Sequence, residues 1–177
     1  MQNKPNTAKI RESVLFLLNN TSADLDQYKI AKAIFLADVG HLNKFGRPIT
    51  YDNYVAMKFG PVPSKTYDLL RHKPESLDVA IKKSNSSVNN YSALRQHEKL
   101  ELSESDESEL QQALAEVEKS TFSKLKQSTH NHIAWKTAWD KKISHAPYMD
   151  YALLFEERDQ EQADYIAWFS KQDECTA

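Results

Sequence analysis

The sequence predicts a mainly α-helical, compact domain with a small β-hairpin or other short β element. Apolar residues recur at helical spacing over most of the chain. Two of the three glycines and three of the six prolines gather in residues 46–64, which interrupts this helical pattern. A polar stretch with short apolar runs on either side lies between residues 77 and 102. The chain has 177 residues, the length of one ordinary domain, so we treat residues 1–177 as a single domain.

Two helices are expected before residue 46. Thr7 can cap the first helix, because its hydroxyl can accept from a free backbone N–H. The buried face of this helix is expected to consist of Ile10, Val14, Leu17 and Leu18. Asp24 is expected to cap a longer helix that runs to about Phe45. Gly46 then ends it, in the left-handed conformation that commonly terminates helices.

Residues 46–64 form the connection after the second helix. Residues 54–58 fit either a short strand or a helical turn, and the sequence leaves both open. Residues 60–63 cannot form regular helix, because two of the four are prolines. Ser64 is expected to cap a helix that continues to about Arg71.

A β-hairpin and four further helices are expected after residue 77. Residues 79–81 and 91–94 resemble two short strands, and the polar tip between them has no apolar residues to bury. Ser103 and Asp106 are spaced as in a capping box, which predicts that a helix begins there. The other helices are expected at about residues 122–128, 133–142 and 157–171.

The composition narrows the class of protein. The net charge of −2 gives no overall basic field to attract nucleic acid. No apolar run approaches the roughly 20 residues that cross a bilayer, and the first nine residues lack the apolar core of a signal peptide. The single cysteine, Cys175, cannot form an internal disulfide, which fits a reducing compartment. We therefore expect a cytoplasmic protein that does not contact membranes.

The side chain of Asp38, on the second helix, is expected to point away from solvent and into the protein core. Successive helical residues turn by about 100°, so a residue nine positions beyond Lys29 faces the opposite side. Lys29 and Lys32 are expected to mark the solvent side of this helix, and the helical neighbours of Asp38 are apolar. An unpaired buried carboxylate would cost several kcal/mol, on the order of the penalty for an isolated charge. Asp38 must therefore have partners.

The partners of Asp38 decide between two interpretations. His41 can meet it across one helical turn, and residues 46–64 can supply Arg47, Lys58 or backbone N–H groups. In the first interpretation, these groups form a purely structural polar contact that fixes how residues 46–64 pack against the second helix. In the second, Asp38, His41, Lys58 and His130 form a site for a small molecule or for proton transfer.

The region from Ser120 to His145 carries a second set of candidates. His130 and His132 lie two residues apart without a neighbouring cysteine or carboxylate cluster, which is weak support for a metal site. Trp135 and Trp139 share one helical face, and this spacing favours core packing over a partner-binding hot spot. We expect no metal ion and no cofactor, since the sequence also lacks a glycine-rich phosphate loop and a nucleophile elbow.

This region contains five lysines but only one acidic residue, Asp140. They are Lys124, Lys126, Lys136, Lys141 and Lys142. A solvated helix face is the commonest explanation of such a strip, and a surface for an anionic partner is another. Nucleic-acid binding is the third and least favoured, because arginines are not interleaved with the aromatic residues.

Residues 35–70, FLADVGHLNKFGRPITYDNYVAMKFGPVPSKTYDLL, closely resemble the central signature of the Panacea domain, the family of SocA-like antitoxins and phage-associated GepA-type proteins. The matching positions are Asp38, His41, Gly46, Arg47, Pro48, Lys58, Gly60, Pro61 and Pro63. Residues 102–110 and 129–139 extend the resemblance, the latter through Thr129, His130 and Trp135. It spans about residues 7–145, and residues 146–177 form a C-terminal helical extension of unknown role. The sequence departs from the family pattern near Tyr51, where Gly or another small residue is common, and at Ile133, where proline is common.

The resemblance implies a helical antitoxin that is encoded beside a toxin and neutralises it by direct protein–protein binding. It also implies that members can act as adaptors that bring a toxin to an AAA+ protease. The motif residues would then be scaffold, with none of them catalytic. The hairpin tip and the chain ends are expected to vary with the partner. An enzymatic or small-molecule site and a nucleic-acid surface are the two alternatives.

Overall fold

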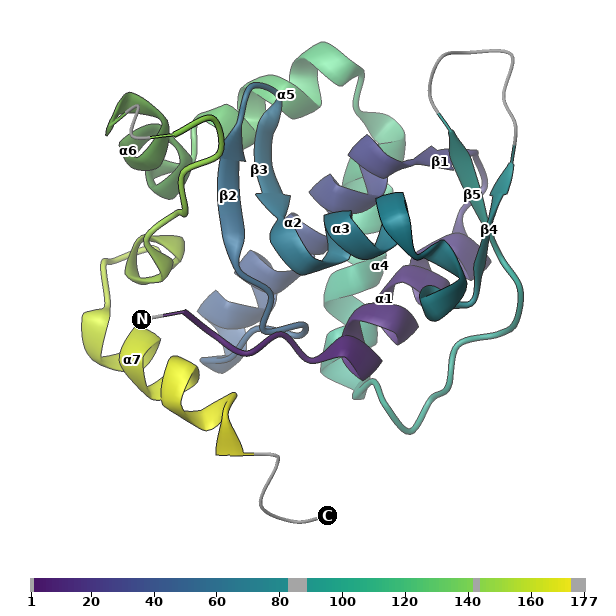
Figure 1. The fold of residues 1–177 in the computed structure, drawn as a ribbon, viewed down its shortest axis with the longest axis horizontal. Coiled ribbons are helices and arrows are strands. Elements are labelled where there is room, and N and C mark those ends of the chain that lie inside the picture. Colours follow the sequence, from purple (N-terminus) through teal and green to yellow (C-terminus); the bar gives the residue numbers. More distant parts are fainter. Residues whose placement is uncertain (1, 83–88, 142–143, 173–177) are drawn as a thin grey trace.

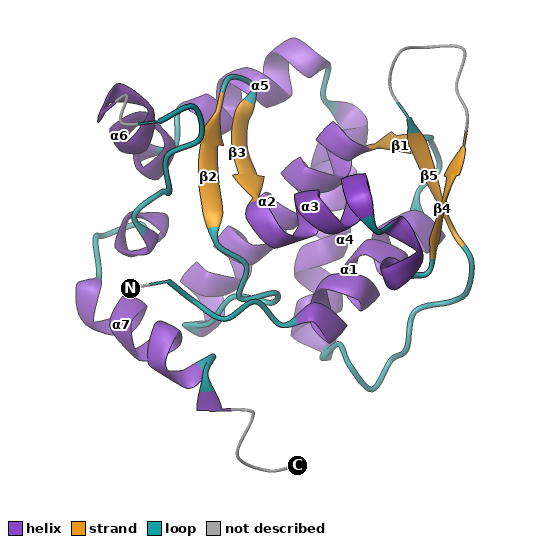
Figure 2. Cartoon of the chain, viewed as in Figure 1, coloured by secondary structure: helices purple, strands orange, loops and turns teal. Residues whose placement is uncertain are grey.

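A computed structural model of the chain describes residues 2–82, 89–141 and 144–172. Short helices surround one long central helix, and two small antiparallel sheets lie on either side of it (Figures 1 and 2). The predicted fold class, mainly α with short β elements, is confirmed. The hairpin tip at residues 83–88, Lys142 and Cys175 lie outside the described residues.

The elements follow one another in an order close to that predicted. The α-helices are α1 Thr7–Asn20, α2 Gln27–Phe45, α3 Ser64–His72, α4 Glu104–Lys119, α5 Phe122–His130, α6 Ile133–Lys141 and α7 Gln160–Phe169. The strands are β1 Leu25–Asp26, β2 Tyr54–Met57, β3 Gly60–Pro63, β4 Val79–Lys82 and β5 Asn90–Ala93. Two 3-10 helices, η1 Pro74–Leu77 and η2 Tyr151–Leu154, complete the described part.

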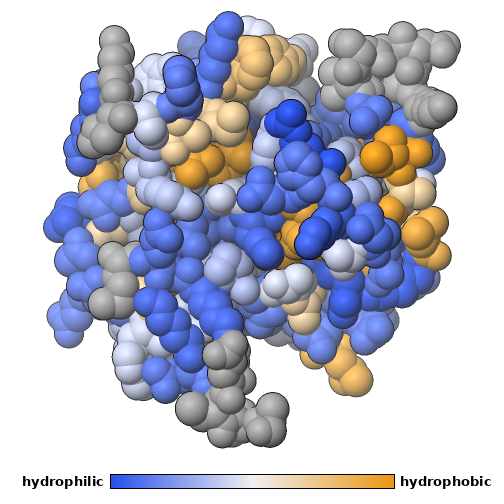
Figure 3. Space-filling view, in the orientation of Figure 1, coloured by the Kyte–Doolittle hydropathy of each residue, from blue (hydrophilic) through white to orange (hydrophobic). Residues whose placement is uncertain are grey.

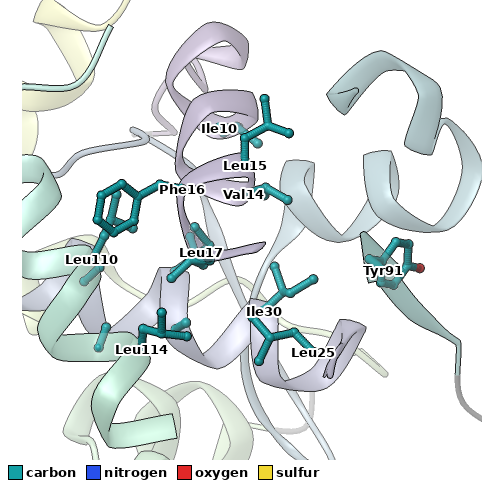
Figure 4. Packing of buried hydrophobic residues seen from close by; sticks show 14 of the residues in the cluster. Ile10, Val14, Leu15, Phe16, Leu17, Leu25, Ile30, Tyr91, Leu110 and Leu114 are labelled. Atoms are coloured by element: carbon teal, nitrogen blue, oxygen red, sulfur yellow. The ribbon is translucent and has the colours of Figure 1, made fainter. Parts of the chain in front are cut away.

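Helix α2 is central because it contributes to two hydrophobic clusters. The first cluster joins α1, α2 and α4, and Figure 4 shows Ile10, Val14 and Leu17 of α1 with Ile30 of α2 and Leu110 and Leu114 of α4. The second cluster joins α2 to β2, α6 and η2 through Phe35, Tyr54, Trp135 and Tyr151. Helix α2 also packs against β3 and α3. It is therefore covered on several sides, unlike a surface helix with one wide polar face.

The two sheets are both antiparallel. Strands β4 and β5 form the predicted hairpin, with Ile81 opposite Tyr91, and β1 adds a third strand through Leu25 opposite the same residue. Strands β2 and β3 form a second hairpin with Lys58 and Phe59 at its turn. The segment that the sequence left open between strand and helical turn is therefore a strand.

Several helix ends agree with the sequence. Gly46 ends α2 at φ 73°, the left-handed conformation expected of it. Ser103 and Asp106 form the expected reciprocal capping box at the start of α4. Leu110, Leu114 and Val117 form the buried face of α4, as their helical spacing indicates.

The last helix, α7, begins three residues later than the expected 157. Three predicted helix caps are wrong by one or two residues. Asn6 rather than Thr7 caps α1, and Asp26 rather than Asp24 caps α2 through its bond from the Lys29 N–H. The pairing of β1 with β5 keeps Asp26 extended up to the start of the helix, which explains the second difference. Ser64 is the first residue of α3 and not its cap. None of the described helices combines the length and apolar character that a membrane crossing requires.

Candidate functional site

Asp38 lies buried at the interface between α2 and residues 46–64. Its Oδ1 accepts the backbone N–H groups of Ile49 at 2.9 Å and Thr50 at 3.0 Å. Its Oδ2 accepts the hydroxyl of Tyr54 at 2.7 Å and that of Thr50. The side chain is 1% exposed, so burial raises the pKa of Asp38 while these four hydrogen bonds oppose the shift.

The expected inward orientation of Asp38 is confirmed. Two of its partners are backbone N–H groups, which were one of the alternatives, and the other two are the hydroxyls of Thr50 and Tyr54, which were not among the expected partners. The cationic candidates lie elsewhere. His41 and Arg47 approach a different carboxylate, and Lys58 is exposed at the β2–β3 turn. The rigid segment therefore supplies hydrogen-bond donors to Asp38 and no charged partner.

A second buried carboxylate, Asp106, lies beside His41 and Arg47 of the motif and Lys9 of α1. The Nε2 atom of His41 lies 3.1 Å from its Oδ1, and Nη2 of Arg47 lies 3.0 Å from the same oxygen. Lys9 of α1 donates to Oδ2 at 2.6 Å. Burial alone would raise the pKa of Asp106, but hydrogen bonding with His41 and Lys9 holds it well below its usual range. Asp106 thus ties α1, α2 and residues 46–50 to the start of α4.

A third buried carboxylate, Asp52, performs the capping that Ser64 was expected to perform. Its Oδ1 accepts the N–H of Lys65 at 2.9 Å, and its Oδ2 accepts the N–H and hydroxyl of Thr66, both at 2.8 Å. These N–H groups belong to the first turn of α3 and have no partner within the helix. Burial raises the pKa of Asp52 to about 6, partly offset by these bonds. No sequence motif marked Asp52, since its partners lie thirteen and fourteen residues away.

Lys32 is buried, which contradicts its predicted place on the solvent side of the second helix. Its Nζ donates to the carbonyl oxygen of Pro61 at 2.7 Å and lies 4.9 Å from the centroid of the Tyr28 ring. Because β3 packs against this side of α2 and Gly60 lies close to the ammonium group, the lysine is buried, with an exposure of 0%. Burial lowers the pKa of Lys32 to about 7.

His130 and Trp135 are stacked on each other at the junction of α5 and α6. Their ring centroids lie 3.8 Å apart, and the indole N–H donates to the carbonyl oxygen of Met57 at 3.1 Å. Trp135 also stacks on Trp139 at 5.3 Å, as their shared helical face predicts. Burial lowers the pKa of His130, and nearby lysines add to the effect. These rings anchor the β2–β3 hairpin to α6.

The predicted site residues therefore fall into separate groups. Within the described ranges, no hydrogen bond or ion pair joins His130 to Asp38, His41 or Lys58. The same ranges contain no group of three His, Cys, Asp or Glu side chains placed to hold a metal ion. The arrangement connects helices and hairpin through buried polar contacts.

Comparison with known protein families shows the family to which the chain belongs. The chain matches the family described as "Antitoxin SocA-like, Panacea domain" over residues 30–136. The chain is a member of this Panacea-domain family. The matched region contains Asp38, Asp52 and Asp106 and most of the segments that they contact, while Lys9 of α1 lies before it. Neither the curated proteins nor the solved structures gave a match.

Tyr51 and Gly60 of this Panacea domain both have a positive φ angle. Tyr51 adopts φ 54°, a left-handed conformation that a glycine adopts more readily than a residue with a side chain. Gly60 adopts φ 107°, and a Cβ there would lie 2.9 Å from Oγ1 of Thr129 and 3.1 Å from Nζ of Lys32. The turn thus approaches α5 and α2 more closely than a larger residue allows.

The three motif prolines surround these positions. Pro48 is buried next to Ile49, so its fixed φ directs the chain toward Asp38. Pro61 and Pro63 lie in β3, which pairs only with β2 in the described sheet. Proline is tolerated in such a strand because the missing N–H can face away from the ladder.

Gly60→Ala is expected to lower the free energy of unfolding by about 1–3 kcal/mol, because the new Cβ combines an unfavourable φ with two close contacts. Urea unfolding monitored by circular dichroism measures this loss. Leu100→Ala is the matched control, since Leu100 is 101% exposed and should change stability by less than about 0.5 kcal/mol. Equal unfolding curves for Gly60→Ala and the parent would show that the turn tolerates the methyl group.

Proposed function

We propose that this Panacea-domain protein is an antitoxin that neutralises a cognate toxin by direct protein–protein binding. The observation that carries the proposal is the match to the SocA-like antitoxin family across the central 107 residues, 30–136. The toxin would be encoded beside this chain, as the family resemblance implies. The chain would act by covering the surface that the toxin needs for its own activity.

The use of the motif side chains supports a scaffold role for them. Asp38 and Asp52 accept hydrogen bonds from the same chain with both carboxylate oxygens, and Asp106 accepts them through Oδ2. A carboxylate held in this way stabilises one arrangement of its neighbours, since each donor would otherwise be left buried and unpaired. Partner binding would then involve the outer surface, with a total buried area on the order of 1,600 Å² in a standard complex.

Co-expression tests the proposal. The open reading frame adjacent to this chain's gene is expressed from an inducible promoter, alone or together with this protein. We expect the adjacent product alone to stop growth and the pair to restore it. The matched control is a co-expressed, unfolded variant of this chain. An adjacent product that stops growth equally with and without the parent protein would refute the proposed function.

The choice of host separates occlusion from adaptor-mediated degradation. Under occlusion, this protein restores growth equally in hosts with and without their AAA+ proteases, and the toxin level stays constant. Under the adaptor mechanism, rescue and loss of toxin both require the protease. We expect the first result, because binding alone is sufficient when the toxin's working surface is covered.

A further inference from the structure

Aromatic and lysine side chains gather where the β2–β3 turn meets the start of α5. We call this set the aromatic–lysine patch; it consists of Tyr28, Lys58, Phe59, Phe122 and Lys126. Figure 3 shows hydrophobic colour beside blue at this end of the molecule, at the top of the view. The patch combines residues from α2, a hairpin turn and α5, so the fold and not one local motif creates it.

The rings of the patch contact one another, and the two phenylalanines among them remain open to solvent. Phe59 and Phe122 meet edge to face at 5.7 Å, and Phe122 lies 4.8 Å from Tyr28. The two phenylalanines are 46% and 54% exposed. Neighbouring exposed aromatic rings are a common mark of protein interfaces, where such residues act as binding hot spots.

The backbone of the turn that carries Phe59 is fixed by contacts with α2, α5 and α6. Gly60 approaches Thr129 and Lys32 closely, and Lys32 donates to the carbonyl oxygen of Pro61. The indole of Trp135 donates to Met57, at the other end of the turn. Because the backbone on both sides of the exposed ring is anchored, little conformational freedom is lost when a partner binds.

The lysines of the patch give it a positive charge. Nζ of Lys58 lies 5.5 Å from the centroid of Phe59, and Nζ of Lys126 lies 5.6 Å from it. Among the described residues, neither lysine has a carboxylate within ion-pair distance. Lys9 and Lys44, in contrast, each contact a carboxylate of this chain. The positive charge therefore remains available on a protein whose net charge is −2.

We propose that the aromatic–lysine patch is the surface that docks the toxin, and that it takes an acidic segment carrying at least one apolar side chain. This inference rests on the proposed antitoxin function. The apolar side chain would cover Phe59 and Phe122, while the carboxylates would face Lys58 and Lys126. Apolar contact would supply most of the affinity, and the charges would supply orientation and a faster association rate.

Two double variants test the rings and the charges separately. Phe59→Ala with Phe122→Ala removes the rings, and Lys58→Glu with Lys126→Glu reverses the charges. Trp168→Ala on α7 is the matched aromatic control, because Trp168 is 55% exposed and lies outside the patch. Lys136→Glu with Lys141→Glu, two exposed residues of α6, is the matched charge control. Thermal unfolding checks that each variant is folded like the parent.

The measurements are growth rescue and the affinity for the product of the adjacent open reading frame. We expect the phenylalanine variant to bind at least about 30-fold more weakly and to lose rescue, as expected for hot-spot residues. The charge-reversal variant should bind at least about 10-fold more weakly at low salt, and raising the salt should weaken binding by the parent. Both controls should stay within about threefold of the parent.

The outcomes separate the inference from the proposed function. Folded patch variants that rescue growth and bind like the parent would overturn the inference and leave the antitoxin function intact. A parent protein that neither binds nor neutralises the adjacent product would overturn both. The parent protein and the two double variants of the patch are also tested for binding to single-stranded DNA at low salt. Parent binding to DNA that is lost on charge reversal, with toxin binding unchanged, would assign the patch to nucleic acid instead.

Discussion

Asp38→Ala is expected to lower the free energy of unfolding by about 3–5 kcal/mol. The substitution leaves four buried donors without their acceptor, namely the N–H groups of Ile49 and Thr50 and the hydroxyls of Thr50 and Tyr54. Each unsatisfied buried group costs about 1–3 kcal/mol, and the hydroxyls can recover part of this by rotating. A loss of this size is a large fraction of the 5–15 kcal/mol that stabilises a typical domain. Urea unfolding at pH 7 measures it.

Asp38→Asn is the graded comparison for this prediction. The amide oxygen can keep the two backbone donors, and the amide N–H₂ can donate to the two hydroxyls if these rotate to accept. We therefore expect a loss of about 1–2 kcal/mol, between that of the alanine variant and zero. Asp68→Ala, at an exposed position of α3, should have almost no effect. Equal stability of the Asp38→Ala protein and the parent would contradict the structural role assigned to Asp38.

Lys32→Met is expected to change stability in opposite directions at low and high pH. Burial lowers the pKa of Lys32 from 10.5 to about 7 in the folded state. Between these values the unfolded state binds more protons, so the stability of the parent rises as the pH rises from 7 toward 10.5. At pH 6 the full cost of burying the charge is present, at most about 5 kcal/mol for a shift of this size. Methionine fills a similar volume without that cost.

The methionine variant also loses the hydrogen bond to the carbonyl oxygen of Pro61, which costs about 1–2 kcal/mol. We therefore expect Lys32→Met to be more stable than the parent by about 1–3 kcal/mol at pH 6 and less stable by about 1 kcal/mol at pH 10. Urea unfolding at pH 6, 8 and 10 measures this change of sign. Lys65→Met, at an exposed position of α3, is the control and should leave the pH dependence unchanged. A stability difference that is the same at all three values would show that Lys32 is not buried as a charged group.

Local chemistry allowed part of this fold to be predicted. Gly46 and the Ser103–Asp106 capping box were identified because each acts on backbone groups within a few residues. Asp38 was identified because helical periodicity alone places it opposite Lys29 and among apolar neighbours. The long motif at residues 35–70 indicated the family, which the match over residues 30–136 shows.

Contacts between distant segments could not be predicted in the same way. Lys32 was misplaced because periodicity assumes that a helix has one solvent face, whereas α2 is covered by two clusters. Asp106 is 65 residues from His41 and 59 from Arg47, so no local pattern joins them. Strand β1 has two residues, too few to show alternation. The aromatic–lysine patch likewise depends on three separate elements meeting in space.

Titration of the purified toxin with this protein is the most direct test of whether the protein binds the toxin on its outer surface. The product of the adjacent open reading frame, kept inactive for purification, is titrated with this protein in a calorimeter without any protease. We predict a saturable, stoichiometric complex that also elutes as one species in size-exclusion chromatography. A folded toxin that gives no heat of binding and elutes separately, although this protein restores growth in cells, would contradict neutralisation by direct binding.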